Sequence, residues 1–110
     1  MVGIIALSLF GYGFFSDPSN NIPVPSGAKS AVEEAKNDLA KRKGIDKKKI
    51  TLVSVESVDW PDTSLGYPEP GMMYAQVITP GCKIFLSHEE EIFEYHSDKG
   101  DRVIYCGSVL

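Results

Sequence analysis

The sequence predicts an α+β fold in which one principal helix, at about residues 28–43, packs on a four- to five-stranded antiparallel sheet. A single stretch repeats apolar residues at the three- and four-residue spacing of a helix face. Four or five short segments rich in β-branched and aromatic residues follow it, separated by turns, and no helical spacing recurs after Ile50. The 110 residues, 43% of them hydrophobic, suffice for one such domain.

The first 16 residues differ from the rest because none of them is charged. Their apolar run is shorter than the roughly 20 residues that cross a bilayer, but it fits the roughly 7–15 of an export signal. We therefore predict that residues 1–16 are a signal peptide or an N-terminal hydrophobic anchor, with a strand packed on the domain as the alternative. The protein would then be secreted or membrane-anchored, outside the cytoplasm, with membrane contact only through this segment. Residues 17–27, with three prolines, are a predicted linker before a single domain at 28–110.

The predicted helix has a narrow apolar face and signals at both ends. The residues of that face are Ala28, Ala31, Val32, Ala35 and Leu39. Ser30 and Glu33 have the spacing of a capping box at the amino end. Gly44 can end the helix in the left-handed conformation, with Ile45 folding back on the last turn.

The predicted strands are Ile50–Trp60, Met72–Thr79, Cys82–Ser87, Ile92–Ser97 and Arg102–Cys106. A two-residue turn at 89–90 and a tight turn at 99–100 set the register of the last three. They place one set of side chains on the face beneath the helix: Ile84, Leu86, Phe93, Tyr95, Ile104 and Cys106. In the first strand, Trp60 shares the face of Val53 only if a bulge falls near 56–57.

The two cysteines are predicted to stay separate thiols. In this register Cys82 and Cys106 lie about 9 Å apart across the strands and about 13 Å along them. A disulfide needs Cα atoms within about 7 Å of each other. A plain meander therefore does not bridge them.

The charge distribution weighs against nucleic acid as a partner. Eight Lys and Arg residues lie between Lys29 and Lys49, whereas ten acids and three bases follow Ile50. The basic run has no aromatic residue to stack on bases and is typical of a solvated helix face. The chain also has no Walker loop and no Cys-x-x-Cys motif, so no cofactor is expected.

The connection between the first two predicted strands is the candidate functional element. Residues 61–71 form a long loop with three prolines and two glycines, and long loops in compact domains are often functional. Its candidate binding residues are Asp62, Ser64, Leu65, Tyr67 and Glu69. A recognition loop predicts that Leu65, Tyr67 and Glu69 are exposed while Trp60 holds its base in the core. A structural lid predicts instead that Leu65 and Tyr67 are buried.

At this loop the chain resembles a group of small, uncharacterised, mostly exported prokaryotic domains. The residues that carry the likeness are Trp60, Pro61, Asp62, Ser64, Leu65, Gly66, Pro68, Pro70, Gly71, Met72, Met73, Tyr74 and Gln76, followed by Pro80, Gly81, Ile84, Leu86, Tyr95, His96, Asp98, Val103 and Cys106. It covers about residues 50–106 and implies no established activity. Members of that group often carry a cysteine where this chain has Tyr67, so the disulfide that the resemblance implies for Cys106 lacks its partner here.

Two enzyme interpretations are open. Ser64, His96 and either Asp62 or Asp98 supply the residue types of a nucleophilic triad, but the Gly-x-Ser-x-Gly elbow is missing. Clusters that contain metal-ligand types occur at residues 88–91 and at Asp59, Asp62 and Ser64. Neighbouring strand residues point to opposite faces and acidic turns are usually solvated, so no metal site is expected.

The leading hypothesis is a non-enzymatic binding or accessory domain that docks an unknown protein or peptide through the 61–71 loop, with a protease-inhibitor-like contact as one version. The alternative is a small hydrolase or metal-dependent enzyme centred on His96. A His96→Ala change is expected to leave partner binding intact under the first hypothesis and to abolish activity under the second.

Overall fold

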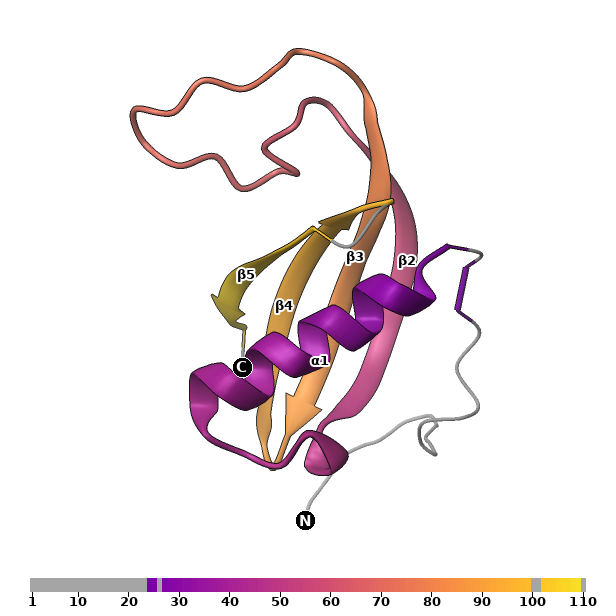
Figure 1. Ribbon diagram of the computed structural model, residues 1–110, viewed down its shortest axis with the longest axis vertical. Coiled ribbons are helices and arrows are strands. Elements are labelled where there is room, and N and C mark those ends of the chain that lie inside the picture. The colour runs from indigo at the N-terminus through magenta and orange to yellow at the C-terminus, as the bar shows by residue number, and fades with distance from the viewer. Residues whose placement is uncertain (1–23, 26, 100–101, 110) are drawn as a thin grey trace.

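The fold is taken from a computed structural model that describes residues 24–25, 27–99 and 102–109. The described elements are α1 (Lys29–Lys43), a short 3-10 turn η1 (Lys47–Lys49), β2 (Thr51–Trp60), β3 (Thr79–His88), β4 (Glu91–Asp98) and β5 (Val103–Ser108). Helix α1 lies across one face of the sheet (Figure 1). The predictions for residues 1–16, and for most of the linker, lie outside the described residues.

The sheet is an antiparallel meander in the order β2-β3-β4-β5. The predicted α+β class, with one principal helix on an antiparallel sheet, is thus confirmed for this part of the chain. The predicted strand Met72–Thr79 is wrong, because only Thr79 lies in a strand and residues 72–78 belong to a loop. Since β2 pairs directly with β3, those residues have no neighbouring strand.

Helix α1 ends as predicted but begins differently. Gly44 adopts φ 67°, and its N–H donates to the carbonyl of Ala40, so the left-handed stop is confirmed. Ala28 is the N-cap, and no side chain caps it, so the predicted capping box is wrong. Glu33 points instead to Lys47, with 2.6 Å between carboxylate and ammonium, which joins α1 to the turn that follows it.

The main core lies between α1 and the sheet. Its fully or nearly fully buried side chains are Ala28, Ala31, Val32, Ala35, Leu39, Ile50, Leu52, Cys82, Ile84, Leu86, Phe93 and Tyr95. Small residues on the helix allow a close approach, and large ones on the sheet fill the space. The five residues predicted for the helix face are all in this cluster.

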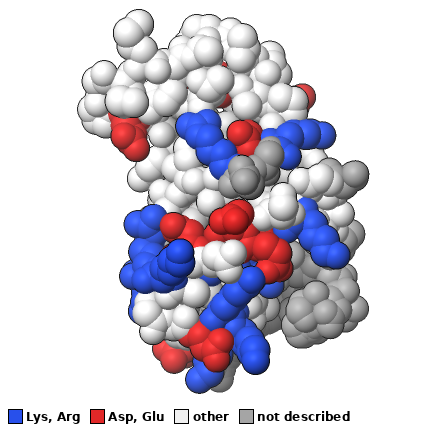
Figure 2. All heavy atoms as spheres, in the orientation of Figure 1, with Lys and Arg blue, Asp and Glu red and all other residues white. Residues whose placement is uncertain are grey.

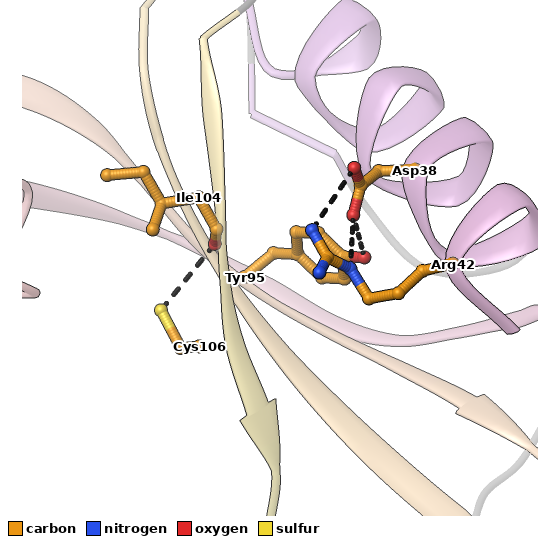
Figure 3. A network of polar contacts seen from close by, with 5 residues as sticks. All are labelled: Asp38, Arg42, Tyr95, Ile104 and Cys106. Atoms are coloured by element: carbon orange, nitrogen blue, oxygen red, sulfur yellow. Dashed lines mark hydrogen bonds and ion pairs between the residues drawn. The ribbon is translucent and has the colours of Figure 1, made fainter.

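A polar contact fixes the helix over the sheet (Figure 3). The Tyr95 hydroxyl donates to Asp38 Oδ2 at 2.6 Å, and Arg42 Nε donates to the same oxygen at 3.0 Å. The Arg42 guanidinium also lies 4.2 Å from the centre of the Tyr105 ring. Burial, and next the contact with Asp38, raise the pKa of Tyr95, so the phenol keeps the proton that it donates.

The register between β3 and β4 is as predicted: the two-residue turn at 89–90 sets Leu86 opposite Phe93. The bulge in β2 is not near 56–57 but between Leu52 and Ser54. Beyond it the alternation runs unbroken, so Trp60 faces away from α1.

The register between β4 and β5 differs from the prediction by one residue. Tyr95 pairs with Tyr105, not with Ile104, because the Asp98 N–H donates to the Arg102 carbonyl, leaving three residues in the turn instead of two. Val103, Ile104 and Tyr105 therefore lie on the faces opposite to those predicted, and the register shifts again between the pairs Tyr95–Tyr105 and Phe93–Ser108. Ile104 and Cys106 lie on the side away from α1, and Figure 3 shows the Cys106 thiol directed to the Ile104 carbonyl there. The expectation of separate thiols is confirmed, although Cys82 and Cys106 do not share a face.

Candidate functional site

The candidate site is the loop of residues 61–78, which joins β2 to β3 and projects beyond the sheet (Figure 1). Its base covers the face of the sheet opposite α1. There the Trp60 indole stacks on the His96 imidazole, with ring centroids 4.4 Å apart and planes 25° apart. Trp60 Nε1–H donates to the Ser97 carbonyl at 2.9 Å, which satisfies the buried indole. Trp60 thus begins a second buried cluster, separate from the main core.

Leu65 and Gly66 close over this pair of rings. The Leu65 side chain is fully buried, and its carbonyl lies 2.6 Å from His96 Nδ1. Both residues have left-handed backbone, with φ 58° at Leu65 and 73° at Gly66. A Cβ on Gly66 would lie 2.8 Å from Trp60 Cζ3, so glycine is required both by conformation and by contact. The loop is therefore shaped to fit the rings.

His96 joins the loop to the sheet through both ring nitrogens. Nδ1 faces the Leu65 carbonyl, and Nε2 lies 2.5 Å from Glu94 Oε2. The Leu65 carbonyl can only accept, so Nδ1 carries the proton of that bond. The nearly buried ring is thus held at both nitrogens, by the loop and by Glu94 of β4.

Asp62 and Ser64 form the turn that presents Leu65. Asp62 Oδ1 accepts from the Ser64 hydroxyl at 2.5 Å and from the Ser64 N–H at 2.9 Å. These two donors, the hydroxyl first, lower the pKa of Asp62 below its usual range. The turn is thus held best while Asp62 is ionised.

The two arms of the loop are tied together at Thr63. Its N–H donates to the Ala75 carbonyl at 3.1 Å, and the Ala75 N–H donates to Thr63 Oγ1 at 3.0 Å. Arg102, just before β5, donates from Nη1 to the Thr63 carbonyl at 2.8 Å. Thr63 therefore connects the two arms of the loop with each other and with the start of β5.

Past this tie the loop turns back at an exposed tip. The Glu69 N–H donates to the Tyr74 hydroxyl at 3.0 Å, and the Met72 N–H donates to the Glu69 carbonyl at 3.2 Å. The large exposed apolar side chains of the loop are Tyr67, Met72, Met73, Val77 and Ile78. In Figure 2 the loop end of the visible face carries few charged atoms, whereas both signs crowd the region of α1.

The five predicted binding residues fall into two groups. Tyr67, 44% exposed, and Glu69 are at the surface as a recognition loop requires, and Trp60 is buried as predicted. The expectation that Leu65 is exposed is wrong, because its left-handed backbone turns the side chain inward beneath the loop. Asp62 and Ser64 shape the turn. The loop is thus a lid at its base and an exposed projection at its tip.

Sequence reasoning missed the residues that tie the loop together and hold it on the sheet. Thr63, Ala75 and Arg102 make the tie between the arms, and Glu94 holds the imidazole of His96. No motif spacing connects them, since the contacts join segments 12 to 39 residues apart. The register of β4 does place Glu94 and His96 on one face, and that was the available signal.

The triad interpretation does not match the geometry. The Ser64 hydroxyl donates to Asp62, and the two nitrogens of His96 face the Leu65 carbonyl and Glu94. The serine and the imidazole are therefore not joined as nucleophile and base. In the part of the chain that the structure describes, no three His, Cys, Asp or Glu side chains gather as a metal site requires.

The two thiols lie in surroundings that suppress the thiolate. Burial, and next the Glu94 carboxylate, raise the pKa of Cys106 to about 12, and burial raises the pKa of Cys82. The thiolate is the reactive form of cysteine. Both residues therefore behave as small apolar side chains at neutral pH.

These features define a small α+β domain whose sheet is covered by a helix on one face and by the base of a fixed loop on the other. The chain belongs to the family described as Domain of unknown function (DUF8738), whose model matches residues 32–106, from α1 into β5. The family is thus an uncharacterised one, as the resemblance at the loop implied. No curated protein and no solved structure matches the chain. Within the described ranges, no helix is long and apolar enough to span a bilayer.

Proposed function

We propose that this protein is a binding domain outside the cytoplasm that docks a protein or peptide through the 61–71 loop, with its tip, residues 67–71, as the contact surface. The observation that carries the proposal is the contrast within one loop. Its base is buried and hydrogen-bonded to the sheet, while its tip holds Tyr67 and Glu69 at the surface. The base alone is enough to cover the sheet, so a purely structural lid does not explain the exposed tip.

The physical advantage of such a tip is that little conformational entropy remains to be lost when it binds a partner. A loop already held in one conformation loses little entropy when a partner binds. Pro68 and Pro70 restrict the backbone on either side of Glu69, and the bond from the Glu69 N–H to Tyr74 closes the turn. Tyr67 supplies the type of side chain that carries much of the energy of protein interfaces.

The binding proposal is tested with random peptides displayed on phage and selected on the immobilised full-length chain. Selected peptides are then synthesised and titrated by fluorescence anisotropy. Tyr67→Ser is expected to weaken their binding at least about tenfold, or about 1.4 kcal/mol. Val53→Ser is the matched control, since Val53 on the edge strand β2 is 42% exposed against 44% for Tyr67. Failure to select any peptide, or equal binding by both variants, would contradict the proposal.

The His96→Ala comparison does not separate binding from catalysis in this fold. His96 lies under the loop and holds the Leu65 carbonyl, so its removal disturbs the tip as well. Tyr67 is the better position, because its side chain is exposed and distinct from the buried base.

The location outside the cytoplasm is supported by the uncharged residues 1–16 and the proline-containing segment that follows. A fusion of residues 1–27 to a reporter that is active only outside the cytoplasm is expected to show activity. Insertion of two lysines into the apolar run is the control that should abolish it. A reporter that remains in the cytoplasm in both forms would refute this part of the proposal.

A further inference from the structure

The return arm of the loop, residues 72–78, has the sequence of a strand but no strand beside it. Met72, Met73, Val77 and Ile78 are among the most exposed large apolar side chains of the described residues, and Met73 is 94% exposed. The arm lies outside the proposed contact surface at 67–71. A solvated strand-forming segment with exposed apolar side chains is a typical site for pairing with another chain.

The backbone of the arm is satisfied on one side only. Ala75 uses both its N–H and its carbonyl in the tie to Thr63. Residues 72–76 form neither helix nor turn, and a bend follows at Val77. Where such a segment is extended, successive residues direct these groups to opposite sides, so those of Tyr74 and Gln76 point away from Thr63. Among the described residues, the backbone groups of Tyr74 and Gln76 have no hydrogen-bond partner. The arm therefore offers an unpaired edge to a partner.

We propose that this edge pairs with the same arm of a second copy of the chain, antiparallel and about a two-fold axis at Ala75. Tyr74 of each copy then exchanges backbone hydrogen bonds with Gln76 of the other. This inference goes beyond the proposed function, because it concerns the return arm and leaves the tip of each copy free for its own partner.

The sequence of the arm favours a second copy over an unrelated chain because the arm is complementary to itself. Pairing about Ala75, with the bend at Val77 straightened, sets Met72 opposite Ile78 of the other copy and Met73 opposite Val77. All the outer pairs are thus apolar with apolar, which stabilises adjacent strands. No charged residue lies between positions 70 and 82, so two identical arms meet no like charges.

The position of the arm leaves room for such a pair. Figure 1 shows the loop projecting past the end of the sheet, well away from α1 and from the opposite end of the molecule. Two copies can therefore meet at their loops while their helices remain far apart. The symmetric contact closes on itself and produces a dimer, as isologous interfaces do.

The register is tested by cysteine cross-linking of the full-length chain in a Cys106→Ser background, with Cys82 left buried and oxidised glutathione as the electron acceptor. Ala75→Cys places the new thiols opposite each other at a non-hydrogen-bonded pair, about 4.5 Å apart at Cα, which suits a disulfide. The Ala75→Cys variant is expected to form a covalent dimer without any second variant present. Met73→Cys and Val77→Cys are expected to form it only when mixed, since position 73 lies about 13 Å along the strand from its own copy.

Two results would overturn the proposal. One is a monomeric Ala75→Cys chain after oxidation; the other is equal cross-linking by all three single variants, which indicates random collision. Because all variants keep residues 1–16, association through that segment does not change the pattern. Peptide binding by a chain that fails to cross-link would refute the dimer and leave the proposed function standing.

A second measurement uses sedimentation equilibrium without any oxidant. Gln76→Pro removes the outward N–H from both copies and is expected to raise the dimer dissociation constant by about tenfold or more. Val53→Pro, on the edge strand β2, is the control. It is expected to leave the dimer dissociation constant unchanged, because β2 takes no part in the proposed pairing. A wild-type chain that stays monomeric at high concentration, or a Gln76→Pro chain that associates as the wild type does, would contradict the proposal.

Discussion

The two faces of the sheet are covered in different ways. On the face of α1, a dozen mostly aliphatic side chains pack together over several turns of helix and three strands. On the opposite face, the base of the 61–78 loop rests on one stacked pair of rings, Trp60 and His96, and one buried leucine. The first cover consists of area removed from water; the second depends on a few directed contacts.

This difference teaches which part of the domain can open alone. The loop cover contains strained backbone at Leu65, φ 58°, and it depends on the hydrogen bond between the Leu65 carbonyl and His96. Few buried apolar contacts and local strain are the properties of regions that open below the global free energy of unfolding. A binding tip on such a cover has one conformation while the loop is closed, and the loop can open without unfolding of the core.

The largest effect is expected on the helix face. Leu39→Ala removes a side chain with no exposed surface between α1 and the sheet, so it is expected to cost about 2–5 kcal/mol of unfolding free energy. Urea denaturation followed by far-UV circular dichroism measures it. A loss below about 1 kcal/mol would show that the helix is not the principal cover of the sheet.

Leu65→Ala is the matched change on the loop face, because Leu65 is equally buried. Its cost is expected to be smaller than that of Leu39→Ala, since the loop can detach without unfolding the sheet. Trp60, the only tryptophan, reports on the loop by fluorescence, while circular dichroism reports on the whole domain. The two urea transitions should separate in this variant. Coincident transitions with a loss as large as that of Leu39→Ala would mean that both covers open together.

Gly66→Ala tests the fit between the loop and the rings. It is expected to cost about 1–3 kcal/mol, from a left-handed alanine and from a Cβ that meets Trp60. Gly71→Ala is the control: its φ is 83°, but nothing lies within 4 Å of the added carbon. The difference between the two variants measures the contact with the indole. Equal losses would show that only backbone strain matters at Gly66.

Acid is expected to loosen the loop before the core. The pKa of Asp62 is lowered in the folded state by its bonds to Ser64, so its contribution to stability is present above the ordinary Asp pKa of about 3.9. That contribution is lost as pH falls through the lower, folded-state pKa. Asp62→Asn should therefore weaken the loop at neutral pH and flatten the acid change in Trp60 fluorescence. Asp59→Asn, at an exposed acid of β2, should leave the acid change as in the wild type.

The helix face was largely predictable, because it follows from periodic burial. The spacing of Ala31, Val32, Ala35 and Leu39 identified α1, and the two-residue turn at 89–90 fixed the register of β3 and β4. The error at β5 arose from a single residue in a turn, since Asp98 pairs with Arg102 across three residues and not with Asp101 across the two that were predicted. Because side chains alternate between the two faces of a strand, this one residue moves Val103, Ile104 and Tyr105 to the opposite faces.

The loop face was not predictable in the same way. The sequence marked residues 61–71 as unusual, yet neither the left-handed backbone of Leu65 nor the contact from Leu65 to His96 has a period to detect. Residues 72–78 were predicted as a strand because strand propensity describes side chains, whereas a strand also needs a neighbour. The structure gives this segment a tie to Thr63 instead of a ladder.

The smallest effect on stability is expected at the tip, where binding can be tested separately from the covering of the sheet. Tyr67→Ser removes an exposed side chain, so the free energy of unfolding should change by no more than about 0.5 kcal/mol, and both urea transitions should coincide with those of the wild type. Binding of a selected peptide should nevertheless fall, because the contact surface is lost while the base stays intact. A loss of stability comparable to that of Leu65→Ala would mean that Tyr67 also belongs to the cover. The tip would then be a continuation of the lid, and the sheet would have two structural covers and no separate binding surface.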